Sequence, residues 1–399
     1  MLAKNNMKKS STTFQDKRER CVKNIPLILS SLFIASILCL FFLISPKPLT
    51  LLPNQGPDIF DDDHPQHNKQ ENLSQTTKVS SSSSNSKPQK EENKCDLFKG
   101  HWVPSLEGES SYYTNSSCTT IPDSKNCFRH GRMDTDFLKW KWKPHECELP
   151  RFNPTSFLNI VGGKKMAFIG DSVARNHMES LLCLLSQEDT PKDMYKDPED
   201  KYRQWYFPKH DFTLMMIWSR FLIVGEERIV NGTGCVYCNE QNVTNYNIDL
   251  PIRMAFRTTF MHINGSKNKK RGLLTVLRTF APAHFENGVW NNGGYCNRTS
   301  PLSEAEADFG SFDWQLRSIQ LEEFERAKRE KGEKRLFEIL DVTRAMLMRP
   351  DGHPGDHWGN KWMKGYNDCT HWCLPGPVDL WSEFLLALLI RSQLGILTS

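Results

Sequence analysis

Three residue types that could together perform acyl transfer occur in two short motifs far apart in the chain. Ser172 lies in FIGDSVARNH (168–177), where two bulky apolar residues run into Gly-Asp-Ser and helix-compatible residues follow. Asp368 and His371 lie three residues apart in YNDCTHWCLPGPVD (366–379). A serine hydroxyl is a weak nucleophile until an adjacent base takes its proton. A carboxylate at this spacing can fold back onto the imidazole and fix its tautomer. The two motifs together predict a Ser-His-Asp catalytic set.

The residues around Ser172 predict a strand, a tight turn and a helix. KKMAFIGD (164–171) is a short apolar run between charged and Gly-containing turns, and SVARNHMESLLCLLS (172–186) has apolar residues at helical spacing. Ser172 would then lie at the carboxyl end of a parallel strand, where α/β sheets bind ligands. Gly170 permits a close turn, and free N–H groups at the helix start can stabilise an oxyanion. The alternative for Ser172 is a plain helix N-cap.

The rest of the chain predicts an α/β domain with a parallel central sheet. Strand-like and helical runs alternate after residue 150, which is typical of a sheet covered on both faces. The strand-like runs are 213–224, 273–280 and 335–343, and the helical patterns are 313–330 and 378–393. Residues 95–150 carry four cysteines and many aromatic residues in irregular pieces. We interpret them as a disulfide-stapled N-terminal subdomain ahead of a catalytic part, 151–399.

The N-terminus predicts a single membrane-spanning helix. Residues 25–44 form an uncharged apolar run of 20 residues, long enough to cross a bilayer. Basic residues dominate 1–24, so the positive-inside rule places this tail in the cytosol and the remainder in a lumen. A cleaved signal peptide is the alternative. Residues 45–94 are rich in Ser, Asn, Gln, Lys and Pro, which indicates a flexible stem before a lumenal domain, 95–399.

Cysteine usage agrees with a lumenal domain. Ten of the 12 cysteines follow the apolar run, which in an oxidising compartment indicates up to five disulfides. A local disulfide is favoured over a zinc site for Cys235 and Cys238, and we predict no metal site. The net charge of +4 gives no reason to expect nucleic acid. Glycosylation sequons occur at Asn72, Asn115, Asn231, Asn242, Asn264 and Asn297.

Further polar and aromatic residues are candidates for the site. Asp171 is expected to bond the backbone of the turn, while Arg175 and Asn176 are candidates for the oxyanion or the acetyl donor, with a surface salt bridge as the alternative. His353 and His357 are competing bases. The other expectation for their loop, 349–358, is that it lines or braces the cleft.

Aromatic rings can offer flat faces to sugars, although core packing is the more common role of a tryptophan. Asp351 and Asp356 accompany the two histidines of 349–358, and the tryptophans considered for glycan contact are Trp290, Trp358, Trp362 and Trp372.

The sequence resembles the plant trichome birefringence-like family of polysaccharide O-acetyltransferases over nearly the whole chain. The resemblance rests on the anchor, the stem, the opening CDLFKGHWVP, the RPDGHPG sequence and the paired GDS and DCTHWC motifs. HFENGVWNNGGYCNRT (284–299) most resembles the subgroup associated with xyloglucan acetylation.

This resemblance implies an SGNH/GDSL-like fold, a single-pass type II protein of the Golgi membrane, and transfer through an acetyl-serine. Ser172 would be the nucleophile, His371 the general base and then acid, and Asp368 its orienting partner. The family also suggests the pairs Cys95–Cys147, Cys118–Cys183, Cys127–Cys373 and Cys296–Cys369, with Cys235–Cys238 left to pair locally.

We therefore expect an enzyme that acetylates a hemicellulose, with galactose side chains of xyloglucan as the favoured acceptor. No Gly-rich phosphate loop is present, so we expect no bound cofactor and treat the acetyl donor, acetyl-CoA-derived or other, as a co-substrate. A membrane protein that delivers acetyl groups is a candidate partner. The alternatives are acetylation of xylan or mannan, a glycan acetylesterase with the same triad, and a non-catalytic wall-glycan-binding protein.

Overall fold

The computed structural model describes residues 95–397, apart from 107–110, 221, 223–247, 266–272, 331–335 and 360–364. The predicted cytosolic tail, membrane anchor and stem lie outside the described residues. Within the part that is described, no helix is both long and apolar enough to cross a bilayer.

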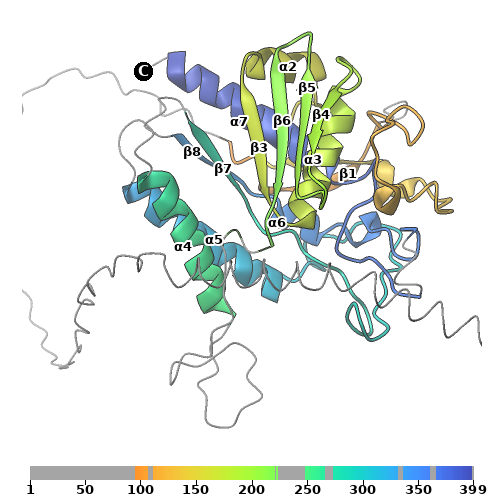
Figure 1. The fold of residues 1–399 in the computed structure, drawn as a ribbon. Coiled ribbons are helices and arrows are strands. Elements are labelled where there is room, and N and C mark those ends of the chain that lie inside the picture. The colour runs from red at the N-terminus through yellow and green to blue at the C-terminus, as the bar shows by residue number, and fades with distance from the viewer. Residues whose placement is uncertain are drawn as a thin grey trace, which may run out of the picture. The chain divides into compact units, whose positions relative to one another are not determined.

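The largest sheet is mixed, with the strand order β3-β6-β5-β4 (Figure 1). β3 (Lys165–Gly170) pairs in parallel with β6 (Phe212–Trp218), whereas β5 (Tyr202–Phe207) pairs antiparallel with both β6 and β4 (Lys192–Lys196). The prediction of a parallel sheet therefore holds for β3 and β6 and is wrong for β4 and β5. Short loops connect β4, β5 and β6, and only hairpins can form across them, because a parallel pair needs a long crossover.

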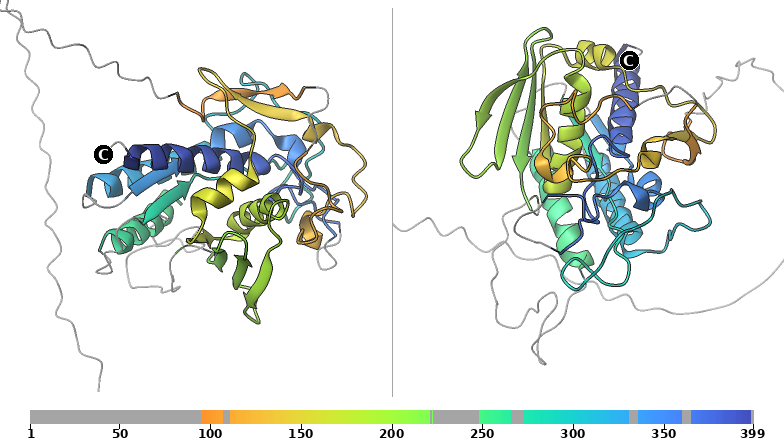
Figure 2. Two further views of the ribbon diagram at one scale, coloured as in Figure 1. Left: turned by 90° about the horizontal axis from the view of Figure 1, so that it is seen from above. Right: turned by 90° about the vertical axis from the view of Figure 1, so that its right-hand side faces the viewer.

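A second, parallel pair consists of β7 (Leu274–Arg278) and β8 (Leu336–Leu340). Their crossover contains α5 (Phe312–Glu330), which packs beside α4 (Asp249–Gly265). Aromatic residues of α4, α5 and β8 form a small core over this pair. The last helix, α7 (Asp379–Leu397), packs against β8 and against α3 (Figures 1 and 2). The predicted strands 273–280 and 335–343 and helices 313–330 and 378–393 are thus confirmed, with slightly different ends.

The main core lies between α3 (Ser172–Leu185), α7 and the mixed sheet. The Cys-rich segment contributes to this same core: β1 (Gly100–Pro104) and β2 (Trp140–Pro144) pair antiparallel, and Trp142 is buried among residues of α7. This segment, which holds the Cys95–Cys147 disulfide, therefore shares its core with the residues that follow it, since two short strands bury too little surface to be stable alone. The remaining short elements are α2 (Pro154–Val161), α6 (Thr343–Leu347) and the 3-10 turns Asp123–Lys125, Asp136–Leu138 and Pro350–Gly352.

Candidate active site

Ser172 is the first residue of α3 and directly follows the N-cap residue Asp171. The Asp171 carboxylate accepts hydrogen bonds from the backbone N–H groups of Val173 (3.0 Å) and Ala174 (3.2 Å), which is the usual action of an N-cap. Gly170 allows β3 and α3 to approach closely, because a Cβ there would lie 2.8 Å from the Ala174 Cβ. The expected strand–turn–helix is therefore present, and it holds Ser172 half-buried at the start of the helix.

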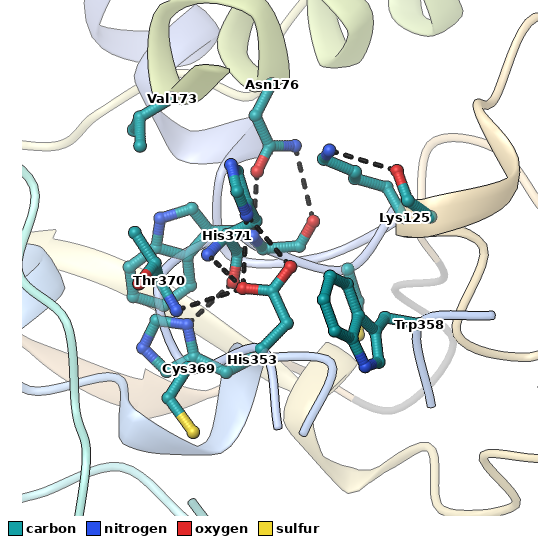
Figure 3. Close-up of polar contacts among 12 residues, drawn as sticks. Lys125, Val173, Asn176, His353, Trp358, Cys369, Thr370 and His371 are labelled. Carbon is teal, nitrogen blue, oxygen red and sulfur yellow. Dashed lines mark hydrogen bonds and ion pairs between the residues drawn. The ribbon is translucent and has the colours of Figure 1, made fainter. Parts of the chain in front are cut away.

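Asp368 and His371 contact each other in the loop before α7, and Figure 3 shows His371 with its polar contacts. His371 Nδ1 lies 2.8 Å from Asp368 Oδ2 and 3.1 Å from Oδ1. Asp368 Oδ1 also accepts the backbone N–H groups of His371 (2.9 Å) and Thr370 (3.1 Å). The carboxylate thus fixes both the imidazole and the backbone that carries it.

The charge state of Asp368 follows from these contacts. Burial alone would raise the pKa of Asp368, but its hydrogen bonds and charge interaction with His371 outweigh burial and hold this pKa well below its ordinary value. An ionised carboxylate only accepts, so the neutral imidazole of His371 carries its proton on Nδ1 and has an acceptor at Nε2. That Nε2 is buried and has no hydrogen-bond partner among the described residues. It is the atom that takes the nucleophile's proton in a Ser-His-Asp set.

Asn176 connects the helix of Ser172 to the loop of His371. Asn176 lies one turn after Ser172, so both residues share one face of α3. Its side-chain oxygen accepts the Trp372 backbone N–H (2.7 Å), and its side-chain nitrogen donates to the Trp372 carbonyl (3.3 Å). Figure 3 shows Val173 and Asn176 on the side of α3 that faces this loop. Ser172 and His371 make no hydrogen bond with each other in this structure. Such bonds commonly tighten only when substrate binds.

The structure changes the expected oxyanion donors. The N–H groups of Val173 and Ala174 are occupied by the Asp171 carboxylate, and both polar atoms of Asn176 are occupied by Trp372. Asp171 is thus the structural cap that was expected, and the oxyanion role is wrong for Asn176. The N–H of Ser172 itself is the first-turn amide that has no partner among the described residues.

Arg175 makes the salt bridge that was its alternative role. Its guanidinium Nη1 lies 3.0 Å from the carboxylate of Asp200, and its Nη2 donates to the Asp200 carbonyl. The side chain therefore points to the loop between β4 and β5, and nothing in this arrangement aims it at the oxyanion.

Two disulfides fix the loop of His371 to distant parts of the chain. Cys373 pairs with Cys127 in the Cys-rich segment, and Cys369 pairs with Cys296. Cys95–Cys147 and Cys118–Cys183 are also formed, so the described pairs are the four that the resemblance implies. Cys235 and Cys238 lie outside the described residues.

His353 and His357 are not placed as the base. His353 is buried, and both of its ring nitrogens are occupied by the His371 carbonyl and by His284. His357 is half-buried and bonds the His130 carbonyl (3.1 Å), with Asp356 3.3 Å away. Asp351, the other carboxylate of this loop, is paired with buried Arg349. The loop 349–358 therefore supports the backbone of His371 through His353 and does not supply the base.

The tryptophans considered for glycan contact differ in exposure. Trp372 is fully buried and stacks on His353, so the prediction of glycan contact is wrong for these two residues. Trp290 is 57% exposed. Trp358 is half-buried, donates to the Tyr366 carbonyl and lies beside the site in Figure 3. Both remain candidates, and Trp362 lies outside the described residues.

Lys125 and Glu179 also contribute to the electrostatics of the site, although sequence reasoning missed both. Burial raises the pKa of Glu179, against the opposing charges of Lys125, Arg175 and His371. Helical periodicity could have identified Glu179, because it lies two turns after Ser172 on α3. No sequence signal identifies Lys125, whose ammonium helps to lower the pKa of Asp368.

The sequons differ in accessibility. Asn115 and Asn297 are exposed. Asn264 is half-buried, and its side-chain nitrogen donates to the Ala327 carbonyl of α5. The other sequons, Asn72, Asn231 and Asn242, lie outside the described residues.

This fold and site define a GDSL/SGNH-like α/β protein. Residues 149–234 and 226–388 match the model of the GDSL/SGNH-like acyl-esterase family found in Pmr5 and Cas1p, and residues 93–148 match the PMR5 N-terminal domain.

Named relatives with similar sequences identify the family to which the chain belongs. The chain is 54% identical over 352 residues to xyloglucan O-acetyltransferase 4 of Populus trichocarpa, covering 76% of this chain and 83% of that protein. It is 50% identical over 343 residues to xyloglucan O-acetyltransferase 2 of Arabidopsis thaliana, covering 74% and 82%. It is 41% identical over 352 residues to protein trichome birefringence-like 19 of the same plant, covering 75% and 82%. The chain belongs to the trichome birefringence-like family.

Proposed function

We propose that this protein is an O-acetyltransferase that transfers acetyl groups to xyloglucan, on the hydroxyls of its galactose side chains. The observation that carries the proposal is the Asp368–His371 pair with a free, buried Nε2, held by Asn176 against the helix that begins at Ser172. The relatives named xyloglucan O-acetyltransferases support the choice of acceptor.

The reaction is a double displacement. His371 Nε2 takes the Ser172 hydroxyl proton while Oγ attacks the acetyl carbonyl of the donor, and the Ser172 N–H donates to the oxyanion. The tetrahedral intermediate expels the leaving group, which takes the proton back from His371, and Ser172 is left acetylated. A sugar hydroxyl then gives its proton to His371 and attacks the acetyl-serine. Collapse of the second intermediate transfers the acetyl group and returns the proton to Ser172 Oγ.

Transfer to a sugar requires that the glycan hydroxyl reacts in place of water, through positioning and water exclusion. Exposed Trp290 and half-buried Trp358 are the aromatic residues proposed to contact the glycan.

The same proposal places the chain in the Golgi membrane as a type II protein, anchored by residues 25–44. Its catalytic domain would face the lumen, where the disulfides form, and a membrane protein would supply acetyl groups.

The test uses the full-length chain in detergent with an acetyl donor and a panel of hemicellulose oligosaccharides, read by mass spectrometry. Ser172→Ala is compared with Ser300→Ala, a matched control at an exposed serine. We expect acetyl gain on a galactosylated xyloglucan fragment, lost only in Ser172→Ala.

Gain only on xylan or mannan would refute the acceptor and keep the enzyme class. Loss of acetyl groups from pre-acetylated fragments, without gain on any, would make the protein an esterase. Glycan binding that survives in Ser172→Ala, without turnover in either protein, would identify a non-catalytic binding protein.

A further inference from the structure

Two histidines outside the proposed catalytic set lie behind His371 in a chain of short contacts. His353 Nδ1 lies 2.6 Å from the main-chain oxygen of His371, and His353 Nε2 lies 2.7 Å from His284 Nδ1. The far nitrogen of His284, Nε2, lies 3.1 Å from the main-chain oxygen of Leu347. His353 also stacks on Trp372, with ring centroids 4.1 Å apart.

Both ends of the chain are carbonyl oxygens, and two neutral rings in contact can donate to only one of them, so the distances decide which. A carbonyl oxygen only accepts, so the shortest contact requires a proton on His353 Nδ1. In a neutral ring His353 Nε2 is then an acceptor, and the proton of the 2.7 Å contact belongs to His284 Nδ1. The lone pair of His284 Nε2 is left facing the Leu347 carbonyl, at the longest of the three distances.

A further proton on His284 Nε2 would complete the last contact but would place a positive charge in the interior. Burial lowers the pKa of His284 to about 4. Burial, together with repulsion from His284, lowers the pKa of His353 well below its ordinary value. Both rings are therefore neutral near pH 7, and the hydrogen bonds run in one direction, toward His371.

The final acceptor of these hydrogen bonds is the peptide group between His371 and Trp372. Its carbonyl accepts from His353 on one side, and its N–H, from Trp372, donates to Asn176 of α3 on the other. The backbone of His371 is thus held between the histidine pair and the helix that carries Ser172. A shift of about 1 Å in such a group can cost on the order of 100-fold in rate.

We propose that His284 and His353 are positioning residues. They form a neutral chain of two hydrogen bonds, the histidine relay, in which His284 Nδ1–H donates to His353 Nε2 and His353 Nδ1–H donates to the His371 carbonyl. The relay sets the place of the imidazole that serves Ser172, and its effect on catalysis rests on the proposed function. Neither ring touches the reacting atoms.

The kinetic test compares His353→Asn with His353→Leu. These side chains have nearly the same shape, but only the asparagine amide can replace the Nδ1–H donor. The full-length chain is mixed with nitrophenyl acetate, and the first-turnover rate of Ser172 acetylation is followed by mass spectrometry. This step needs no glycan acceptor. We expect His353→Leu to acetylate about tenfold more slowly than His353→Asn, the effect of one buried hydrogen bond. Equal rates in the two variants would overturn the positioning role.

The second test is the histidine tautomer in the wild-type chain, read by nuclear magnetic resonance after ¹⁵N-histidine labelling. We expect His353 and His284 to carry their protons on Nδ1 at neutral pH, with signals lost in His353→Leu and His284→Gln. His262→Gln is the control, because His262 is exposed on α4. An Nε2–H tautomer or an imidazolium at either position would overturn the relay, even if a variant does not fold. Absence of acetyl transfer to every glycan would refute the proposed function alone, because neither test depends on an acceptor.

Discussion

Replacement of Asp368 by asparagine tests whether the carboxylate sets the tautomer of His371. Oδ1 accepts two backbone N–H groups, those of Thr370 and His371, whereas Oδ2 lies 2.8 Å from His371 Nδ1. In Asp368→Asn only the amide oxygen can keep the two backbone bonds, so the amide nitrogen takes the Oδ2 position. Two N–H groups cannot face each other there, and the imidazole proton moves to Nε2.

With its proton on Nε2, His371 cannot accept the proton of Ser172. The same substitution in a Ser-His-Asp protease lowers kcat by about 10⁴-fold, and we expect a loss of this size here, with KM nearly unchanged. The assay is acetyl transfer to the xyloglucan fragment under saturating donor. Asp356→Asn is the matched control, since Asp356 is an exposed aspartate 3.3 Å from His357.

Retention of more than about one-tenth of kcat in Asp368→Asn would refute the tautomer argument. An equal loss in Asp356→Asn would show that the effect is not specific to the pair. Melting temperatures of both variants separate these results from misfolding.

Three other substitutions test the contacts that hold the site in place. Gly170→Ala should destabilise the protein by about 1–3 kcal/mol in chemical denaturation and lower acetyl transfer, because the new Cβ meets the Cβ of Ala174 at 2.8 Å. Replacement of both Cys127 and Cys373 by serine should cost about 2–5 kcal/mol of unfolding free energy and lower kcat, since this disulfide closes 246 residues and holds the catalytic loop. Unchanged denaturation midpoints would contradict either expectation. Between pH 6.5 and about 4, His284 binds a proton in the unfolded state but not in the folded state. As the pH drops through this range, the unfolding free energy should therefore fall by about 3 kcal/mol more in wild type than in His284→Gln. Parallel plots of unfolding free energy against pH for these two proteins would refute the lowered pKa of His284.

Local sequence signals predicted the elements that carry the site. The apolar run before Gly170 and the helical spacing after Ser172 specify β3 and α3, because each signal lies within one element. The Asp368–His371 contact was also predictable, since the two side chains are three residues apart on one loop.

Contacts between distant segments were not predictable in the same way. The β4 strand, KDMYK, is exposed along its whole length and has no apolar alternation, so only its pairing with β5 defines it. The His284–His353 contact joins residues 69 apart, and neither neighbourhood identifies the other. Asn176 was correctly placed beside Ser172, but its true partner, Trp372, could not be found without the packed loop.

The covalent connection of the His371 loop has a consequence for biosynthesis. Ser172 and its helix emerge from the ribosome long before the loop, and Cys127 must wait 246 residues for its partner Cys373. During that interval Ser172 lacks His371, the base that the proposed function gives it. The full set of Ser172, Asp368 and His371 exists only after translation has passed His371, and its loop is tied to the Cys-rich segment only once Cys127 and Cys373 have paired. An active molecule has therefore been translated past this loop.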